Sequence, residues 1–424
     1  MRRRMRAVLV AVSAAAALMV TTTQAAEKPI KIGIIGPMAF VQGENHWAGA
    51  ELARDEINKA GGIKVGSQKH PIEIVKVDSN EIQSVPDATN AMERALTQDK
   101  VDFVIGGFRT EAVLAMQDVA MDYKKIFLGV GAAHEQLGLR VQQNYDRYKY
   151  WFRIAPIKSG DLGKVLFAGL GAIAAQIRND LGKPVPKVAI VAEKAVWVES
   201  IVKAAQDNLP KMKMEVVGVW QPSPVATDVT AELSAIRRAG ADLVFTAISG
   251  PVGIVMGRQM GELQIPAIPF GINVEAQKEG FWQATAGKGN YVSTLDTYGE
   301  GVEITPQTLP FVNAFKKRFG KPPTYTASTY DAMYALRAAV ETAGTIDADK
   351  LVPVLEKTDL VGAAGRLVFD KLHDPVFGPG YVTGLAVQWQ DGKKVAFWPN
   401  NWNGVTYKGV QTFKIPPQMM QKKN

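Results

Sequence analysis

The chain of 424 residues contains no cysteine, which excludes disulfides, thiolate nucleophiles and cysteine metal ligands. It also excludes the lipid anchor of a bacterial lipoprotein, which is attached to a cysteine. Only four histidines are present, and His46, His70, His134 and His373 do not have the spacing of a metal site. We find no Gly-x-Ser-x-Gly elbow and no phosphate-binding glycine loop after the first predicted strand. We therefore expect no enzyme activity, no catalytic residue, no metal and no cofactor.

A long uncharged apolar run occurs only at the beginning of the chain. Residues 7–20 are apolar and uncharged, four arginines stand within residues 1–6, and residues 21–26 are small or polar. This three-part pattern predicts a cleaved secretory signal peptide over residues 1–26. The alternative is a membrane anchor, but the run is short for crossing roughly 30 Å of hydrocarbon. We therefore expect a soluble protein that is exported to the periplasm.

The charge of the chain gives little support to a nucleic-acid partner. The formal net charge is +8, and removal of the predicted signal peptide takes away four arginines and no acid, which leaves +4. No cluster of basic and aromatic residues is present, so we expect no nucleic-acid binding. Hydrophobic residues make up 47% and charged residues 21%, which is typical of a globular protein. The length favours two lobes over a single core.

From residue 28 onward, short apolar runs alternate with helical patterns. The first series of predicted strands covers residues 30–35, 72–77, 101–105, 126–130 and 150–155, with helices at 47–60, 87–98 and 111–122. The second series covers 187–192, 214–220, 242–247 and 268–271, with helices at 160–181, 198–209, 229–239 and 252–263. This alternation predicts an α/β protein with two doubly wound parallel-sheet lobes.

The C-terminal part has a different pattern. It predicts helices at 310–319 and 328–343, the second of which is expected to pack on the first lobe. Residues 383–389 and 394–398, joined by Asp391-Gly392, predict a β-hairpin.

Candidate ligand-binding residues follow the predicted strands, because open parallel sheets bind ligands at the carboxyl ends of their strands. Gly106-Gly107 permits a tight turn before a helix that begins near Thr110, and the N–H groups of a helix start favour a carboxylate. Thr110 either caps this helix or offers its hydroxyl to a ligand. Arg109 either pairs with an anion or is an exposed surface residue. A lone loop histidine such as His134 is commonly a surface residue.

Several segments together resemble a known family. Residues 30–38 (IKIGIIGPM), 49–58 (GAELARDEIN), 61–63 (GGI), 104–107 (VIGG) and 323–332, with the closing hairpin, resemble the type I periplasmic binding proteins of the branched-chain amino acid transport group. The resemblance covers nearly all of the chain after the predicted signal peptide. It is specific for the family and much less specific for the ligand.

The resemblance implies two α/β lobes joined by three hinge crossovers, near Ala155, Leu295 and Gly362. Lobe 1 would comprise residues 27–155 plus 296–362, and lobe 2 residues 156–295 plus 363–424. A small ligand, an amino acid or a carboxylate, would lie between lobes that close over it. The partners would be the permease and ATPase subunits of an ABC importer, and the protein would act as a monomer. The alternative is a ligand-sensing protein of the same fold that reports to a receptor.

The resemblance also assigns roles to individual residues. Thr110 would bind the carboxylate of an amino acid, the Ala132 carbonyl would contact its ammonium, and His134 stands where a threonine often holds both ends. Trp197 would cover the ligand and Tyr325 would form a wall, although Trp197 could equally be a core residue. The remaining candidates are Gln42, Arg109, Ala133, Ser249 and Asn273.

Two departures from the family pattern bear on the ligand. Neutral Asn273 stands near the position of the glutamate that pairs with the ligand ammonium, and Ser249 stands near the position of a tyrosine. Glu193 or Glu275 could supply the missing acid if the alignment is shifted slightly. Since Arg109 adds positive charge at the carboxylate end, we expect a carboxylate without an α-ammonium group, such as an aromatic or keto acid.

Overall fold

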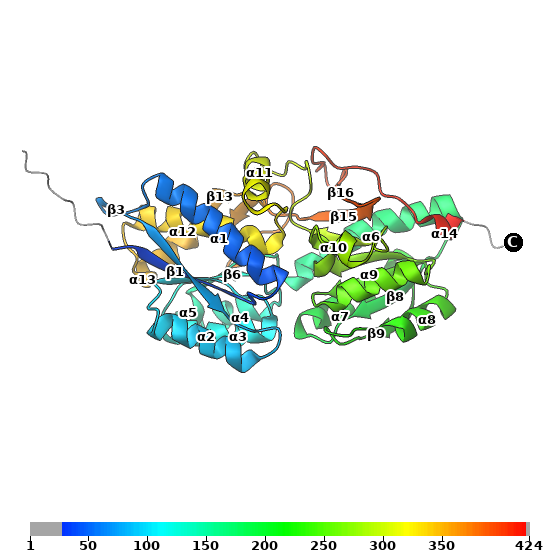
Figure 1. Cartoon of the computed structure of the whole chain (residues 1–424), viewed down its shortest axis with the longest axis horizontal. Coiled ribbons are helices and arrows are strands. Elements are labelled where there is room, and N and C mark those ends of the chain that lie inside the picture. Colours follow the sequence, from blue (N-terminus) through cyan, green and yellow to red (C-terminus); the bar gives the residue numbers. More distant parts are fainter. Residues whose placement is uncertain (1–27, 421–424) are drawn as a thin grey trace, which may run out of the picture.

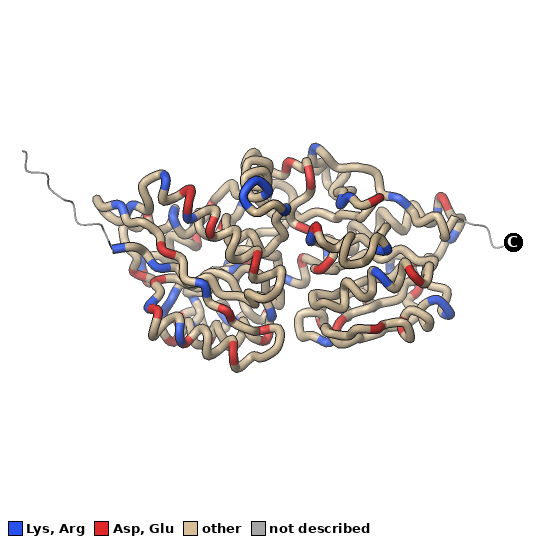
Figure 2. Tube along the Cα trace, in the orientation of Figure 1, with Lys and Arg blue, Asp and Glu red and all other residues tan. Residues whose placement is uncertain are grey.

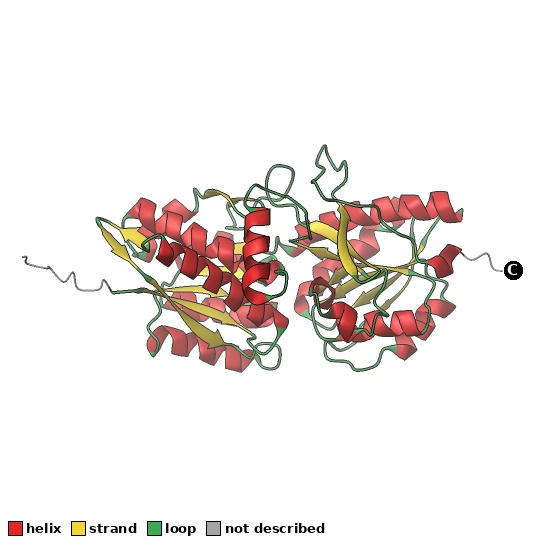
Figure 3. Ribbon diagram, turned by 45° about the horizontal axis from the view of Figure 1, so that its top comes forward, coloured by secondary structure: helices red, strands yellow, loops and turns green. Residues whose placement is uncertain are grey.

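The computed structural model describes residues 28–420, so the predicted signal peptide at residues 1–26 lies outside the described residues. Two lobes lie side by side, and each has a central β-sheet with helices on both faces (Figures 1 and 3). The predicted fold class, two doubly wound parallel-sheet lobes, is confirmed.

The sheet of lobe 1 has five parallel strands in the order β4-β1-β5-β6-β7. Their bounds are Ile72–Asp78, Ile30–Gly36, Phe103–Gly106, Phe127–Val130 and Trp151–Ala155. The helices of this lobe are α1 (Val41–Lys59), α2 (Val85–Thr97), α3 (Thr110–Asp122), α4 (Gln136–Gln143), α5 (Tyr145–Tyr148), α12 (Thr329–Ala343) and α13 (Ala348–Leu355). In Figure 1, α1 and α12 lie on one side of the sheet and α2 and α3 on the other.

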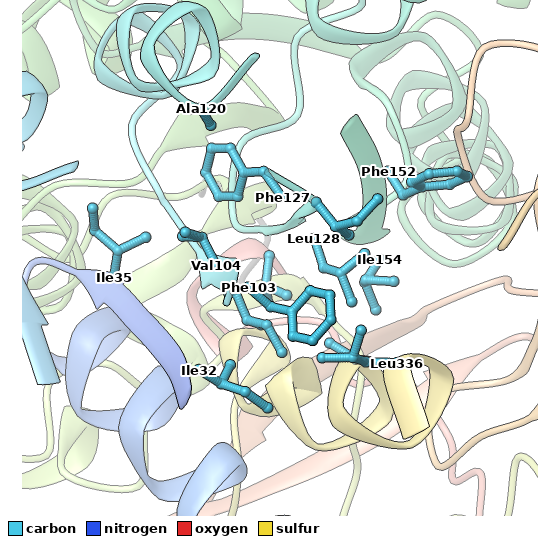
Figure 4. Packing of buried hydrophobic residues seen from close by; sticks show 14 of the residues in the cluster. Ile32, Ile35, Phe103, Val104, Ala120, Phe127, Leu128, Phe152, Ile154 and Leu336 are labelled. Atoms are coloured by element: carbon cyan, nitrogen blue, oxygen red, sulfur yellow. The ribbon is translucent and has the colours of Figure 1, made fainter. Parts of the chain in front are cut away.

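Alternate side chains of the central strands fill both layers of the lobe 1 core. Figure 4 shows Phe127 of β6 pointing toward Ala120 of α3, while Leu128 points with Phe103 toward Leu336 of α12. Successive side chains of a strand face opposite sides of the sheet, so continuous apolar runs such as residues 126–130 are required here. The presence of Leu336 in this core confirms that the helix predicted at 328–343 packs on the first lobe.

The sheet of lobe 2 has seven strands in the order β16-β15-β12-β11-β10-β8-β9. Five of them are parallel and repeat the strand order of lobe 1, namely β9 (Glu215–Trp220), β8 (Lys187–Ala192), β10 (Leu243–Ile248), β11 (Ile268–Asn273) and β12 (Ser293–Asp296). Antiparallel β15 (Leu385–Gln390) and β16 (Lys393–Trp398) complete the sheet. They form the predicted hairpin, and Asp391 and Gly392 at its turn have φ angles of 53° and 83°.

The main helices of lobe 2 are α6 (Ser159–Leu181), α7 (Glu199–Asn208), α8 (Thr230–Arg238) and α9 (Val252–Glu262). Among the described residues, α6 is the one helix long and apolar enough to cross a membrane. Half of its apolar stretch is buried, and Leu166, Leu170 and Ile173 belong to the core of lobe 2. These contacts are typical of a core helix in a globular protein.

The remaining elements are the 12-residue helix α11 and several short segments. They are β2 (Ile63–Val65), β3 (Gln68–His70), η1 (Val196–Val198), η2 (Pro210–Met212), η3 (Val274–Gln277), α10 (Phe281–Ala284), α11 (Thr308–Phe319), η4 (Tyr325–Ser328), β13 (Asp359–Val361), β14 (Arg366–Val368) and α14 (Pro417–Met420).

Several elements, including α4, α13, β2 and β3, were not predicted from the sequence, and two other regions also differ from expectation. The helix expected at 47–60 begins six residues earlier, at Val41, because Phe40 is the extended residue that precedes it (φ −118°). Strand β12 was not predicted, since its sequence Ser-Thr-Leu-Asp lacks an apolar pattern. Its four residues are nevertheless buried between β11 and β15.

The packing of the C-terminal segments bears on the third crossover. Leu367 and Phe369 belong to the core of lobe 1, whereas Val382 packs against the core of lobe 2. We therefore propose that the third crossover lies between Phe369 and Val382, later than Gly362. The first two crossovers would follow β7, at Ala155, and β12, near Leu295.

A buried ion pair ties the segment before this third crossover to lobe 1. Arg153 of β7 and Asp374 have fully buried side chains, and their Nε and Oδ1 atoms are 2.6 Å apart. The Arg153 guanidinium also donates hydrogen bonds to the carbonyl groups of Ala132 and His134, in the loop after β6. One buried cation thus links a strand, the neighbouring loop and a segment more than 200 residues away in the sequence.

Replacement of Asp374 by alanine should lower the free energy of unfolding by about 3–5 kcal/mol, because it leaves the Arg153 charge buried without its partner. Urea denaturation measures this loss. The matched control is Asp207→Ala, which removes the exposed partner of Lys203 and should leave the midpoint unchanged. Equal midpoints for Asp374→Ala and the wild type would contradict this account of the ion pair.

Candidate ligand-binding site

A cleft that is partly open to solvent lies between the two lobes. Its walls come from the carboxyl ends of β5, β6 and β7 in lobe 1 and of β8, β10, β11 and β12 in lobe 2. Most of the lining is apolar, including the side chains of Phe108, Ile154, Ile157, Trp197, Ile272 and Tyr325. Basic and acidic residues alternate along the chain in both lobes (Figure 2).

At the lobe 1 side of the cleft, the chain turns sharply from β5 into α3. Gly106 has a φ of 124°, and a Cβ at this position would collide with the carbonyl oxygen of Ile35. Helix α3 begins at Thr110, which lines the cleft and is 1% exposed. Its hydroxyl has no hydrogen-bond partner among the described residues. Since the first N–H groups of a helix have no partner within it, this helix start is suited to a carboxylate.

Arg109 lines the cleft beside Thr110, but other groups of the protein engage its guanidinium. Nη1 donates to the Ile82 carbonyl at 2.9 Å, and Nε is 3.3 Å from Glu111. The second oxygen of Glu111 accepts from the backbone N–H of Val196, in lobe 2, at 3.0 Å. Arg109 therefore stabilises the rim where the lobes meet, and its charge is shared with Glu111.

A buried carboxylate holds the loop before α3. Glu81 is fully buried and accepts hydrogen bonds from the backbone N–H groups of Phe108 (2.9 Å) and Arg109 (2.7 Å) and from the Ser79 hydroxyl (2.8 Å). Burial raises the pKa of Glu81 to about 7, and these hydrogen bonds offset part of that rise. Glu81 was not among the predicted site residues, although it lies in a loop that follows the strand predicted at 72–77.

Only some of the candidate residues in the loop after β6 line the cleft. Gly131 and Ala133 line the cleft, whereas Ala132 and His134 do not. The Ala132 carbonyl, expected to contact a ligand ammonium, accepts a hydrogen bond from Arg153. The His134 ring accepts from the backbone N–H of Gln136 at 3.1 Å, at the start of α4. His134 thus has a local structural contact and lies outside the cleft lining.

In lobe 2, a second buried carboxylate holds the loop after β10. Glu193 accepts hydrogen bonds from the Trp197 indole (2.9 Å), the Ser249 hydroxyl, and the backbone N–H groups of Ser249 (2.9 Å) and Gly250 (2.8 Å). A carboxylate has about four acceptor positions, so all of those on Glu193 are occupied. Trp197 and Ser249, which are both candidate ligand-binding residues, line the cleft. Glu193 orients both side chains through its hydrogen bonds.

The two candidates after β11 do not line the cleft. Asn273 caps η3, with its Oδ1 accepting from Ala276 and its Nδ2 donating to the Gly253 carbonyl at 3.1 Å. Glu275 forms an ion pair with Lys278. Gln277, which the sequence analysis missed, lies at the end of η3 and does line the cleft.

Two candidates from lobe 1, Tyr325 and Gln42, differ in their relation to the cleft. Tyr325 lines it, and its hydroxyl is 3.4 Å from the Gly131 carbonyl of the same lobe. Burial raises the pKa of the Tyr325 hydroxyl well above its usual value. Gln42 lies at the start of α1, outside the lining, and donates to the Ser249 carbonyl of lobe 2 at 3.4 Å.

Stability should respond to pH through Glu81. Its folded pKa of about 7 exceeds its ordinary value of 4.5, so the folded state binds more protons between these values and loses stability as pH rises. Glu81→Gln removes this loss, and its stability relative to the wild type should increase from pH 5 to pH 8. Urea denaturation at both pH values tests this. The exposed control Glu279→Gln should show no such trend, and a constant difference for Glu81→Gln would contradict the assignment.

Comparisons with known proteins agree with this architecture. Residues 29–393 match the sequence profile of the family described as "Periplasmic binding protein". The "Amino acid binding protein" of Pseudomonas aeruginosa is 25% identical over 81% of this chain and 87% of its own length. The "Leu/Ile/Val-binding protein homolog 8" of Brucella melitensis is 23% identical over 94% of this chain and 97% of its own.

Solved structures share the fold at lower sequence identity. A solute-binding protein of an ABC transporter from R. palustris, in complex with benzoate, aligns with a TM-score of 0.72 at 19% identity, over 87% of this chain and 95% of that one. The branched-chain amino acid binding protein LivJ from Streptococcus pneumoniae, in complex with isoleucine, also has a TM-score of 0.72, at 22% identity over 87% and 100%. The chain belongs to the periplasmic binding protein family.

Proposed function

We propose that this protein is the substrate-binding component of an ABC importer, and that it delivers a small carboxylate without an α-ammonium group to permease and ATPase subunits. The ligand has an aromatic or other apolar body and lies between the lobes, and the protein acts as a monomer. The observation that carries this proposal is the buried, unpartnered hydroxyl of Thr110 at the start of α3, in a cleft with mainly apolar walls.

The start of α3 provides the partners that a carboxylate needs. The Thr110 hydroxyl can donate one hydrogen bond, and the first-turn N–H groups carry the positive end of the helix dipole. Glu81 occupies the N–H groups of Phe108 and Arg109, immediately before this turn. The first turn itself is therefore the part of α3 that remains for the ligand.

The groups that the family resemblance assigns to a ligand ammonium are already used. The Ala132 carbonyl is bound to buried Arg153, a positive charge that would repel an ammonium there. All acceptor positions of Glu193 are occupied, and Asn273 is neutral and caps η3. An ammonium buried without a partner costs several kcal/mol, which favours a ligand that lacks one.

The apolar body of the ligand is inferred from the walls. Phe108, Trp197 and Tyr325 bring three aromatic rings to the cleft, together with branched aliphatic side chains. Aromatic rings pack well in such surroundings. The benzoate-bound neighbour from R. palustris supports an aromatic carboxylate, whereas the names of the curated relatives favour an amino acid.

Replacement of Thr110 by valine tests the carboxylate site. It keeps the shape of the side chain and removes the hydroxyl, and a hydrogen bond to a charged group contributes about 1.5–3 kcal/mol. Affinity for benzoate, measured by titration calorimetry, should therefore fall by roughly 10- to 100-fold.

The matched control is Thr97→Val, at an exposed position where the hydroxyl bonds to the Glu93 carbonyl within α2. It should bind benzoate like the wild type. Benzoate binding that is indifferent to Thr110→Val would contradict this site, and an absence of binding by any aromatic carboxylate would contradict the proposed ligand class.

The proposal includes export with removal of the signal peptide after Ala25 or Ala26. Protein from the periplasmic fraction should therefore begin at Ala26 or Glu27, and N-terminal sequencing measures this. A mature chain that retains Met1 would contradict export by cleavage.

A further inference from the structure

The side chain of Gln277, on the lobe 2 side of the cleft, has a buried hydrogen-bond acceptor without a partner among the described residues. Gln277 is 4% exposed and lines the cleft at the end of η3. Its Nε2 donates a hydrogen bond of 2.8 Å to the Leu295 carbonyl. A carbonyl oxygen can only accept, so this bond fixes which end of the amide is nitrogen. The other end, Oε1, has no hydrogen-bond partner among residues 28–420.

The charged groups beside Gln277 are neutralised within the protein. Lys394 forms a buried ion pair with Asp296 and also donates to the main-chain carbonyl of Gln277. The Thr383 hydroxyl, on the same side of the cleft, is bonded to the Tyr407 hydroxyl at 2.8 Å. This end of the cleft therefore offers a neutral acceptor, Gln277 Oε1, close to a lysine that would repel a second cation.

We propose that Gln277 Oε1 accepts a hydrogen bond from a hydroxyl group of the ligand, an inference that rests on the proposed function. The ligand is then a hydroxylated carboxylate with an apolar, aromatic body. Its carboxylate binds at Thr110 in lobe 1, and its hydroxyl binds at Gln277 in lobe 2. A buried acceptor without a partner is unfavourable, so the site gains affinity from a ligand that satisfies it. Such a site discriminates against analogues that lack the hydroxyl.

This arrangement also gives the ligand a polar contact with each lobe. A ligand favours the closed state only as far as it binds that state better than the open one. A hydroxyl bound by Gln277 adds contacts that exist only when both lobes surround the ligand. Gln277 is thus a specificity-determining residue as well as part of the cleft wall.

The test compares benzoate with 3-hydroxybenzoate, 4-hydroxybenzoate and their fluoro analogues by titration calorimetry. At least one hydroxybenzoate should bind the wild type about tenfold more tightly than benzoate, the usual scale of one hydrogen bond. The fluoro analogue with the same substitution should show no gain, because fluorine cannot donate. This comparison needs only the wild-type protein.

The variant Gln277→Met removes the acceptor and retains the length of the side chain. It should lose the preference for the hydroxylated ligand, so that its affinities for the hydroxybenzoate and for benzoate become similar. Gln283→Met, at an exposed position of α10, is the matched control and should keep that preference.

The outcomes separate this inference from the proposed function. Benzoate binding with no gain for either hydroxybenzoate, or an equal loss for both ligand types in Gln277→Met, would overturn the hydroxyl site while the carboxylate site at Thr110 stands. Failure of every one of these carboxylates to bind would overturn both.

Discussion

Buried carboxylates that accept backbone N–H groups are the constraint on which the geometry of the cleft depends. Glu81 holds the loop before α3, Glu193 holds the loop after β10, and Asp331 of α12 accepts from Ala363 and Ala364. These loops would otherwise leave buried N–H groups unpaired. Each carboxylate satisfies two of them at once and thereby fixes the path of the chain on its side of the site.

The use of these acids within the protein decides what remains for a ligand. Glu193 has no free acceptor position, and Asp296 is neutralised by Lys394. Arg153 similarly donates a hydrogen bond to the Ala132 carbonyl. The acceptor positions of these acids are therefore largely used within the protein, and the buried polar groups of the cleft lining that keep no partner among the described residues are the Thr110 hydroxyl at the helix start and the Gln277 amide oxygen. A zwitterion would need the acceptors that this network has already taken.

Most of the fold could be predicted from the sequence because its strands are continuous apolar runs. The run at 30–35 corresponds to β1, and the hairpin turn Asp391-Gly392 has the positive φ angles that its residue types permit. Strand β12 could not be found, because its sequence Ser-Thr-Leu-Asp lacks an apolar pattern although all four residues are buried in the sheet. The start of α3 at Thr110 was predicted from Gly106-Gly107. The hydrogen bond from Arg153 to the Ala132 carbonyl could not be predicted, because the position of Arg153 depends on Asp374, which is distant in the sequence.

The central claim is that the cleft selects a carboxylate without an α-ammonium group. Leucine and its 2-oxo counterpart, 4-methyl-2-oxopentanoate, share a carbon skeleton and differ at the position in question, so they isolate this claim. Titration calorimetry of the wild-type protein with both ligands measures it directly. We expect the oxo acid to bind more tightly, because its ketone requires no acidic partner. Tighter binding of leucine would contradict the account and would show that the cleft provides an ammonium site after all.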